Sequence, residues 1–405
     1  MSLLLPTTVA CLLITGMGLA LVGSVKLALA QKLRIDEGRV GGLVSLFGFT
    51  TIPVILTAGF LTDLMGRQVV LVGGTVLMVL GLLTLAASHR YATALVSVLL
   101  LGAAWAAQIN VINVLVPHVL KPPAFLSGDI PAISFATNLG NVFFGLGAFL
   151  TPLSVAWALG RLGLAPALRL LAGLVALQAV VAGFSDLPAA MSAGGGGSVL
   201  GPETWSLLGD PVMWLCSMAL FFHGPLEAAM GTWTTTFLGD RGVSEARAAK
   251  LLSAFWLAYM ASRLFTAFVL GPFTARFVSG LGLEAPSEAV LILVLALGCI
   301  GVTSGVVRSR TRRTAIALVI AAGLIFGPIF PSIMAILLGH FPGPVQGRAV
   351  GLLFAISGLG WTFIPMAIGA YAQRTNVQRG FLIAVGSAIG LFLVAGLLTL
   401  TATGG

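Results

Sequence analysis

Charged residues are scarce in this sequence. Only 8% of its 405 residues are charged, 12 acidic and 21 Lys or Arg, whereas 58% are hydrophobic. Soluble domains carry about 25% charged and about 45 to 50% apolar residues. Because so few charges cannot cover a chain of this size in water, most of its outer surface must face an environment as apolar as its interior. The composition excludes a soluble globular protein and predicts one that is embedded in lipid.

Signals of enzyme, metal and nucleic-acid chemistry are also missing. The three cysteines are an odd number within apolar stretches, and the four histidines are scattered, so we predict no disulfide framework and no metal site. No Gly-rich loop ends in Lys-Ser or Lys-Thr, which disfavours an ATP-driven pump. The net charge of +9 comes without basic patches interleaved with aromatic residues, so nucleic acid is not an expected partner. We predict no enzyme activity and no cofactor.

Long hydrophobic runs, by contrast, are abundant. A bilayer-spanning helix needs about 20 mostly apolar residues. The first run lacks a basic start and extends beyond signal-peptide length, so we expect it to be a membrane helix. Twelve spans are predicted in all, at residues 8–30, 40–62, 69–87, 92–117, 132–155, 166–184, 211–238, 247–270, 289–307, 314–338, 350–372 and 380–402.

One polar segment divides these runs into two sets of six. It holds three of the twelve acidic residues and the tract Gly194–Ser198, which is typical of a flexible tether. The predicted organisation is an N-terminal six-helix bundle (1–184), a cytoplasmic Gly-rich linker (185–210) and a C-terminal six-helix bundle (211–405).

The two sets also look weakly alike. FATNLGNVFFGLGAFLTP, which starts at Phe135, is similar to FAISGLGWTFIPMAIGAY, which starts at Phe354. A parallel repeat of this size is typical of transporters, which bind substrate between two halves. Chance similarity between Gly- and Ala-rich helices explains the match equally well.

A polar motif follows the second predicted span. Gly59 begins the segment GFLTDLMGRQ, in which Asp63, Gly66 and Arg67 stand at the end of one helix and the start of the next. This segment resembles the signature loop of the major facilitator superfamily. The resemblance implies twelve helices in two pseudo-symmetric six-helix halves, alternating access, and a cytoplasmic gate at this loop. Gln68 departs from the pattern, because a second basic residue is usual there.

Motifs in the second half resemble the fucose and glucose proton symporters of that superfamily. They are FHGPLEAAMGTW from Phe222, GPIFP from Gly327, and Gly358 and Gly360 before Pro365, together with Phe255, Trp256 and Arg263. The resemblance implies a secondary transporter of a sugar or similar small polar solute. The first and fourth spans carry no carboxylate, where such symporters often have coupling acids, so the sequence leaves sugar specificity and proton coupling open.

Glu227 is the sharpest candidate site, since it alone among the acidic residues lies well inside a predicted span. A buried charge at midspan is costly, and the cost falls if the group faces water, pairs with a cation or takes up a proton. Glu227 is therefore predicted to couple transport to H+ or Na+, with a structural role beside Pro225 as the alternative. Lys26, near the outer end of the first span, is a candidate partner for it or a residue that snorkels to the interface.

Polar and aromatic side chains inside the spans are candidate substrate ligands. Amides suit a polyol because they donate and accept hydrogen bonds without charge, and aromatic rings can stack on a sugar. The same residues can instead hold helices together. The candidates are Gln108, Asn110, Asn113, Asn138, Asn141, Trp233 and Trp256. Arg263 is grouped with Gly59, Asp63, Gly66 and Arg67 as a candidate residue of the cytoplasmic gate.

The family resemblance and the loop charges predict opposite orientations of the chain in the membrane. The resemblance places both termini in the cytoplasm, yet most loop cations would then lie outside, against the positive-inside tendency. They include Arg34, Arg39, Arg90, Arg241, Arg308, Arg310, Arg312, Arg313, Arg374 and Arg379. A basic outer rim also attracts anions, which keeps organic anions open as substrates.

The expected context is a monomer surrounded by membrane lipids in a bacterial inner membrane. Two other functions stay open, namely efflux or uptake of an organic anion or amphipathic compound, and a membrane sensor or assembly subunit that has lost transport.

Overall fold

The computed structural model describes residues 3–126, 131–185, 187, 201–274, 287–341 and 343–403. Within these ranges all regular structure is helical, and twelve helices are long and apolar enough to cross a membrane. The protein is an all-α, multi-pass integral membrane protein, as its composition predicts. The tract Gly194–Ser198 lies outside the described residues.

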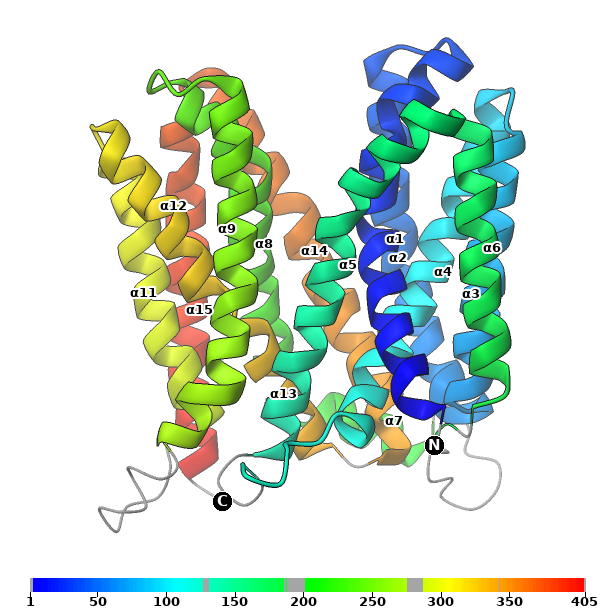
Figure 1. The fold of residues 1–405 in the computed structure, drawn as a ribbon. Helices are drawn as coiled ribbons and strands as arrows, with labels where there is room; N and C mark the ends of the chain where they lie inside the picture. The colour runs from blue at the N-terminus through cyan, green and yellow to red at the C-terminus, as the bar shows by residue number, and fades with distance from the viewer. Residues whose placement is uncertain are drawn as a thin grey trace. The chain divides into compact units, whose positions relative to one another are not determined.

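Figure 1 shows the helices in chain order by colour. The first seven are α1 (Leu4–Leu33), α2 (Glu37–Met65), α3 (Arg67–Ala87), α4 (Tyr91–Val119), α5 (Ala132–Leu162), α6 (Leu164–Gly183) and α7 (Pro202–Gly209). The remaining ones are α8 (Pro211–Gly239), α9 (Glu245–Phe265), η1 (Thr266–Leu270), α11 (Glu288–Arg308), α12 (Arg312–Phe326), α13 (Ile329–His340), η2 (Gly343–Val345), α14 (Gln346–Arg374) and α15 (Val377–Thr403).

The chain forms two compact units. Unit 1 comprises Met1–Leu120, Phe143–Leu207 and Phe341–Ala355, and unit 2 comprises Lys121–Val142, Leu208–His340 and Ile356–Gly405. Each unit therefore contains one part of α5 and one part of α14. Part of the segment predicted as a linker forms the helix α7. Pro202 suits the first position of a helix, and the acidic Glu203 in the first turn is favourable at the positive end of the helix dipole.

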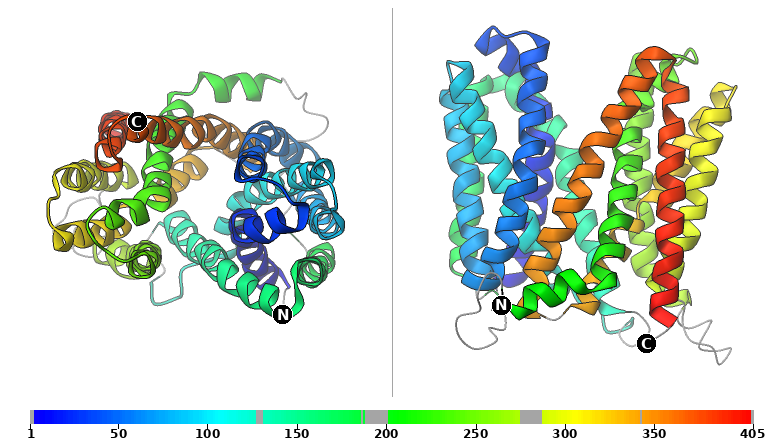
Figure 2. Two further views of the ribbon diagram at one scale, coloured as in Figure 1. Left: turned by 90° about the horizontal axis from the view of Figure 1, so that it is seen from above. Right: turned by 180° about the vertical axis from the view of Figure 1, so that it is seen from behind.

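Each unit has its own apolar core. In unit 1, α4 packs against α1, α2 and α3, and α6 packs against α1 and α3. In unit 2, α15 packs against α8 and α11, and α12 packs against α9 (Figure 2). The fully buried rings of Phe237, Phe255, Phe326 and Phe381 fill unit 2. Large apolar side chains are also exposed along the helices, as a lipid-facing surface requires.

Glycines let two helices of unit 1 approach closely. A Cβ atom on Gly147 of α5 would overlap the carbonyl oxygen of Leu13 in α1, whereas one on Gly160 of the same helix would meet nothing within 4 Å. We expect Gly147→Ala to lower the unfolding free energy by about 1 to 3 kcal/mol, because the clash is with backbone. Gly160→Ala is the matched control and should raise it by about 0.5 to 1 kcal/mol. Thermal unfolding in detergent measures both, and an unchanged melting temperature for Gly147→Ala would contradict the close contact.

The tenth span, Arg312–His340, is interrupted at its prolines. It breaks into α12 and α13 at Gly327 and Pro328. Proline removes a backbone donor and clashes with the preceding turn, so carbonyl groups are freed at the break. In a membrane such groups need partners from neighbouring helices.

Candidate functional site

Glu227 lies in α8 and is linked to an arginine through a tyrosine. Its Oε2 accepts a hydrogen bond of 2.9 Å from the Tyr259 hydroxyl, and Nη2 of Arg263 donates to the same hydroxyl oxygen at 2.9 Å. Tyr259 and Arg263 are buried, whereas Glu227 is only partly buried. The Arg263 guanidinium also lies over the Tyr259 ring, 4.3 Å from its centroid. The three side chains form a network that ends in a carboxylate with some exposed surface.

Arg263 is held by the helix break. Its Nε donates to the Gly327 carbonyl oxygen at 2.9 Å, and its Nη1 donates to the Asn141 carbonyl oxygen at 3.2 Å. Thr137 donates to the Pro331 carbonyl oxygen at 3.0 Å, so side chains from α9 and α5 both bind the interrupted span. The π-helix η1 follows Arg263 within three residues, and such segments are frequent at functional sites. Arg263 is thus part of the Glu227 network, and its role in the cytoplasmic gate stays a prediction.

The two predicted tryptophans both lie in unit 2. Trp256 packs edge-on against Tyr259 at 5.6 Å, and a Cβ on Gly231, one turn after Glu227, would come within 3.3 Å of its ring. Trp256 is therefore next to the Glu227 network. Trp233 lies against Gly369 of α14, and its buried Nε1 has no hydrogen-bond partner. Both rings are partly exposed, as ligands of a solute would need to be.

His223, one helical turn before Glu227, is completely buried, and neither of its ring nitrogens has a hydrogen-bond partner. Its ring packs edge-on against Phe326. A neutral imidazole suits this apolar position, so the charged side chains of the network are Glu227 and Arg263, which the neutral Tyr259 hydroxyl connects.

Asn138 and Asn141 are the two α5 amides predicted as solute ligands. Asn138 and Asn141 each donate Nδ2 to the carbonyl four residues earlier, Ser134 and Thr137 respectively. The Asn138 Oδ1 is buried and has no partner. Asn141 contributes its carbonyl to Arg263, so α5 is tied to the Glu227 network through its backbone.

The amides of α4 belong to unit 1 and serve its packing. Asn110 is fully buried, donates to the Gly347 carbonyl at 3.0 Å and accepts from Thr62 at 3.0 Å. Gln108 accepts from the Thr15 hydroxyl and donates Nε2 to the Thr75 hydroxyl oxygen at 3.5 Å. Because these side chains are occupied within the protein, the alternative of interhelical adhesion fits them better than substrate binding. Asn113 donates to the Ile109 carbonyl.

Lys26 of α1 is exposed. It belongs to unit 1 and Glu227 to unit 2. The proposed pair between them stays a prediction.

The gate motif forms a charged cluster in unit 1. Asp63 Oδ1 accepts from the backbone N–H of Gly347 at 2.8 Å, and Oδ2 accepts from the N–H and Nε of Arg348 at 2.9 and 3.0 Å. Asp63 therefore caps the start of α14, and its partner is Arg348 rather than Arg67. Gly59 allows this approach, since a Cβ there would overlap the Gly347 carbonyl oxygen. Gly66 has a φ of 92°, which turns the chain from α2 into α3.

Arg348 extends the cluster to α7. It donates to Thr204 Oγ1 at 2.9 Å and to Glu203 Oε2 at 3.1 Å. Arg67 is buried, and its Nε and Nη1 have no hydrogen-bond partner. Gln68, the departure from the family pattern, donates Nε2 to the Gly183 carbonyl at 2.9 Å and so caps the end of α6. The neutral Gln68 side chain thus binds the end of α6, at a position where the family pattern has a second basic residue.

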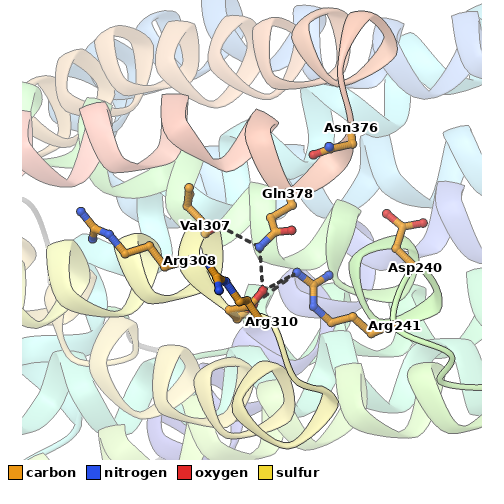
Figure 3. Close-up of a pocket in the computed structure, with 8 residues that line it drawn as sticks. Asp240, Arg241, Val307, Arg308, Arg310, Asn376 and Gln378 are labelled. Carbon is orange, nitrogen blue, oxygen red and sulfur yellow. Dashed lines mark hydrogen bonds between the residues drawn. The ribbon is translucent and has the colours of Figure 1, made fainter.

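A basic pocket of about 960 Å³ opens at one end of unit 2 (Figure 3). Its base is built by Arg241 and Gln378, which both donate to the Ser309 carbonyl at the end of α11. Burial lowers the pKa of Arg241, and neighbouring Asp240 opposes this shift, so the guanidinium stays charged. Arg308 and Arg310 are exposed at the rim. Arg241, Arg308 and Arg310 are three of the loop cations that the sequence analysis names.

The orientation of this pocket can be tested with an introduced thiol. All three native cysteines are buried, so they give little background. We expect Arg310→Cys to react with a membrane-impermeant maleimide in intact cells, because termini in the cytoplasm place this loop outside. Protection in intact cells with labelling after permeabilisation would reverse the orientation.

Two residues of these networks were not found from the sequence. Tyr259 has a weak signal, since it is one of three tyrosines and lies one helical turn before Arg263. Arg348 has only its basic charge beside Gly347. Both act through contacts between segments far apart in the chain, which spacing alone does not reveal.

Comparison with known proteins decides the family. The profile described as Major Facilitator Superfamily matches residues 8–283. The chain belongs to the major facilitator superfamily. Membership in this superfamily makes it a secondary transporter and not an enzyme.

Solved structures of this superfamily share the fold. A crystal structure of the E. coli fucose:proton symporter FucP superposes with a TM-score of 0.77 at 14% identity, over 98% of this chain and 99% of that one. The proton:xylose symporter XylE bound to 6-bromo-6-deoxy-D-glucose gives 0.73 at 12% identity, over 97% and 94%. The human organic anion transporter MFSD10 gives 0.69 at 17% identity, over 97% of each chain.

A curated relative matches part of the sequence. "Bypass of stop codon protein 6" of Saccharomyces cerevisiae is 28% identical over 181 residues, which are 44% of this chain and 35% of the relative. The match therefore spans about a third of that protein.

Proposed function

We propose that this facilitator moves a sugar or similar small polar solute by alternating access, coupled to H+ or Na+ through Glu227. The observation that carries the proposal is Glu227, a partly buried residue inside a membrane span that is tied through Tyr259 to the buried Arg263. The resemblance of the fold to FucP and XylE, which are proton symporters of fucose and xylose by their descriptions, supports the sugar class.

The network suggests how ion and solute are linked. An ionised Glu227 accepts a charge-assisted hydrogen bond from Tyr259, whose hydroxyl is polarised by Arg263. Protonation of Glu227, or a cation bound to it, weakens this hydrogen bond. The Tyr259 hydroxyl is then free to donate to a solute hydroxyl. Trp256, packed beside Tyr259, offers a face on which a sugar ring can stack. Asn138 Oδ1 and Trp233 Nε1 are further unpartnered groups for a polar solute.

An organic anion is the second candidate. Arg263 supplies a fixed positive charge beside the site, the basic pocket supplies a rim that attracts anions, and the human organic anion transporter has a similar fold. For location we propose a bacterial inner membrane. The yeast relative makes a eukaryotic membrane the competing possibility.

Counterflow in proteoliposomes tests the proposed substrate class. Vesicles loaded with one unlabelled hexose, pentose or organic acid at a time are diluted into the same labelled compound at trace concentration. We expect transient accumulation for a neutral sugar and none in vesicles without protein. Counterflow with organic acids alone would replace sugar by anion as the substrate. Failure of the whole panel would favour the sensor or assembly subunit.

A further inference from the structure

Two neighbouring helices of unit 2, α11 and α15, each carry an exposed apolar stripe that ends at an arginine. The two helices pack against each other. The exposed positions of α11 recur at helical spacing and include Val294, Leu297, Gly301 and Arg308. Those of α15 include Arg379, Leu382, Gly386, Ile389 and Leu393. Exposed apolar side chains in a membrane span face lipid, so each arginine stands where a lipid-facing surface reaches the headgroup region.

The two arginines lie at the same end of this helix pair. Gln378, next to Arg379, donates Nε2 to the Val307 carbonyl oxygen at 2.8 Å, so the first turn of α15 meets the last turn of α11. The basic pocket opens at this junction, and Arg241 and Arg310 are among the residues that line it (Figure 3). Four arginines thus gather at one end of the two helices.

The negative groups at this end do not neutralise the arginines of the stripes. Carbonyl groups at the end of α11 are bound by Gln378 and Arg241, which offsets the negative end of its helix dipole. Asp240 lies beside Arg241, and Figure 3 shows the Arg308 side chain directed away from both. Among the residues that the structure describes, no carboxylate forms an ion pair with Arg308 or Arg379. An anion can therefore bind both.

A glycine lies two helical turns below each of these arginines. Gly301 is seven residues before Arg308, and Gly386 is seven residues after Arg379. A Cβ atom on either glycine would meet nothing within 4 Å. Because α11 and α15 run in opposite directions from their junction, both glycines lie at a similar depth, roughly 10 Å below the arginines. Open space at this depth suits an acyl chain, which a soluble anion lacks.

We propose that this end of α11 and α15 binds an anionic phospholipid. Arg308 and Arg379 hold its phosphate, since guanidinium groups bind phosphate oxygens with paired hydrogen bonds. The acyl chains lie along the two stripes, over Gly301 and Gly386. Basic pockets between membrane helices bind phospholipid headgroups in other proteins. A free phosphate would use the arginines but not the stripes, so a lipid accounts for both. The site does not depend on the coupling role proposed for Glu227.

Native mass spectrometry of the full-length protein in detergent tests this site. The probes are palmitoyl-oleoyl phosphatidylglycerol, which is anionic, and phosphatidylcholine with the same acyl chains, which has no net charge. We expect the first phosphatidylglycerol to bind about tenfold more tightly than the first phosphatidylcholine. Arg308→Gln combined with Arg379→Gln should remove this preference. Arg247→Gln combined with Lys250→Gln is the matched control and should retain it, because both cations are exposed in unit 2 but do not line the pocket.

A second set of variants separates a lipid from a soluble anion. Gly301→Leu combined with Gly386→Leu keeps every charge but fills the space below the arginines, so it should weaken phosphatidylglycerol binding. Gly173→Leu, at an equally open and exposed position of α6, should leave this binding unchanged.

Three results would overturn the proposal. Equal binding of the two lipids would mean that the arginines only snorkel to the interface. An unchanged preference after replacement of Arg308 and Arg379 would place the headgroup elsewhere on the protein. Displacement of phosphatidylglycerol by millimolar inorganic phosphate, with no effect of the leucine substitutions, would make the ligand a free phosphate.

Discussion

Glu227→Gln is expected to abolish accumulation of solute against its gradient. Glutamine keeps a carbonyl oxygen that can accept from Tyr259, so the local hydrogen bond survives, but it cannot bind and release a proton or pair with a cation. Uphill uptake in proteoliposomes with an imposed ion gradient should fall to the level of equilibration. Exchange of labelled for unlabelled solute at equal concentrations, which needs no net ion movement, should stay within about threefold of the wild type.

Two comparisons make this result specific. Glu245→Gln removes an exposed carboxylate from the same unit and should leave both uptake and exchange unchanged. Tyr259→Phe removes the link between Glu227 and Arg263 and should weaken solute binding while retaining some uphill uptake. Undiminished uphill uptake by Glu227→Gln would contradict the proposed coupling role of this residue for any substrate.

Asp63→Ala should produce the largest loss of stability among single substitutions in unit 1. Its carboxylate satisfies two backbone N–H groups at the start of α14 and the Arg348 side chain, and the two side chains are 2% and 7% exposed. Removing one partner of a buried ion pair costs about 3 to 5 kcal/mol, and we expect the lower end of this range because Arg348 keeps the half-exposed Glu203 as a partner. The apparent melting temperature in detergent should fall by several degrees.

Asp240→Ala serves as the control, because Asp240 is exposed and should change stability by no more than about 0.5 kcal/mol. Replacing both Asp63 by Ala and Arg348 by Met should recover part of the loss, since no unpaired charge then remains buried. If Asp63→Ala melted together with the wild type, the cluster at the start of α14 would have little energetic weight.

Membrane spans, and charged residues inside them, can be predicted from the sequence because both depend on local composition. Twelve spans follow from run length because lipid leaves the backbone of a span no partner but its own helix. Glu227 stands out for the same reason, as a lone acid in a stretch where charge is costly. These expectations need only local information, and the twelve candidate spans agree with them.

Contacts between distant segments escaped this reasoning. The family motif drew attention to Asp63 and Arg67, but the partner of Asp63 is Arg348, 285 residues away. Asn110 and Gln108 were predicted as solute ligands from residue type, and that role stays a prediction. Their hydrogen-bond partners, which come from α1, α2, α3 and the start of α14, could not be inferred from spacing. Pro328 marks the break after α12, but the sequence does not show that Arg263 binds the freed Gly327 carbonyl.

Helices α5 and α14 contribute residues to both units, so the units are joined by continuous helical backbone. Bending a hydrogen-bonded helix stores elastic energy, and the interior prolines Pro152 and Pro365 lower its stiffness locally. The stiffness of α5 and α14 would then help to set the turnover rate, and residues that touch neither solute nor ion could tune the speed of the cycle.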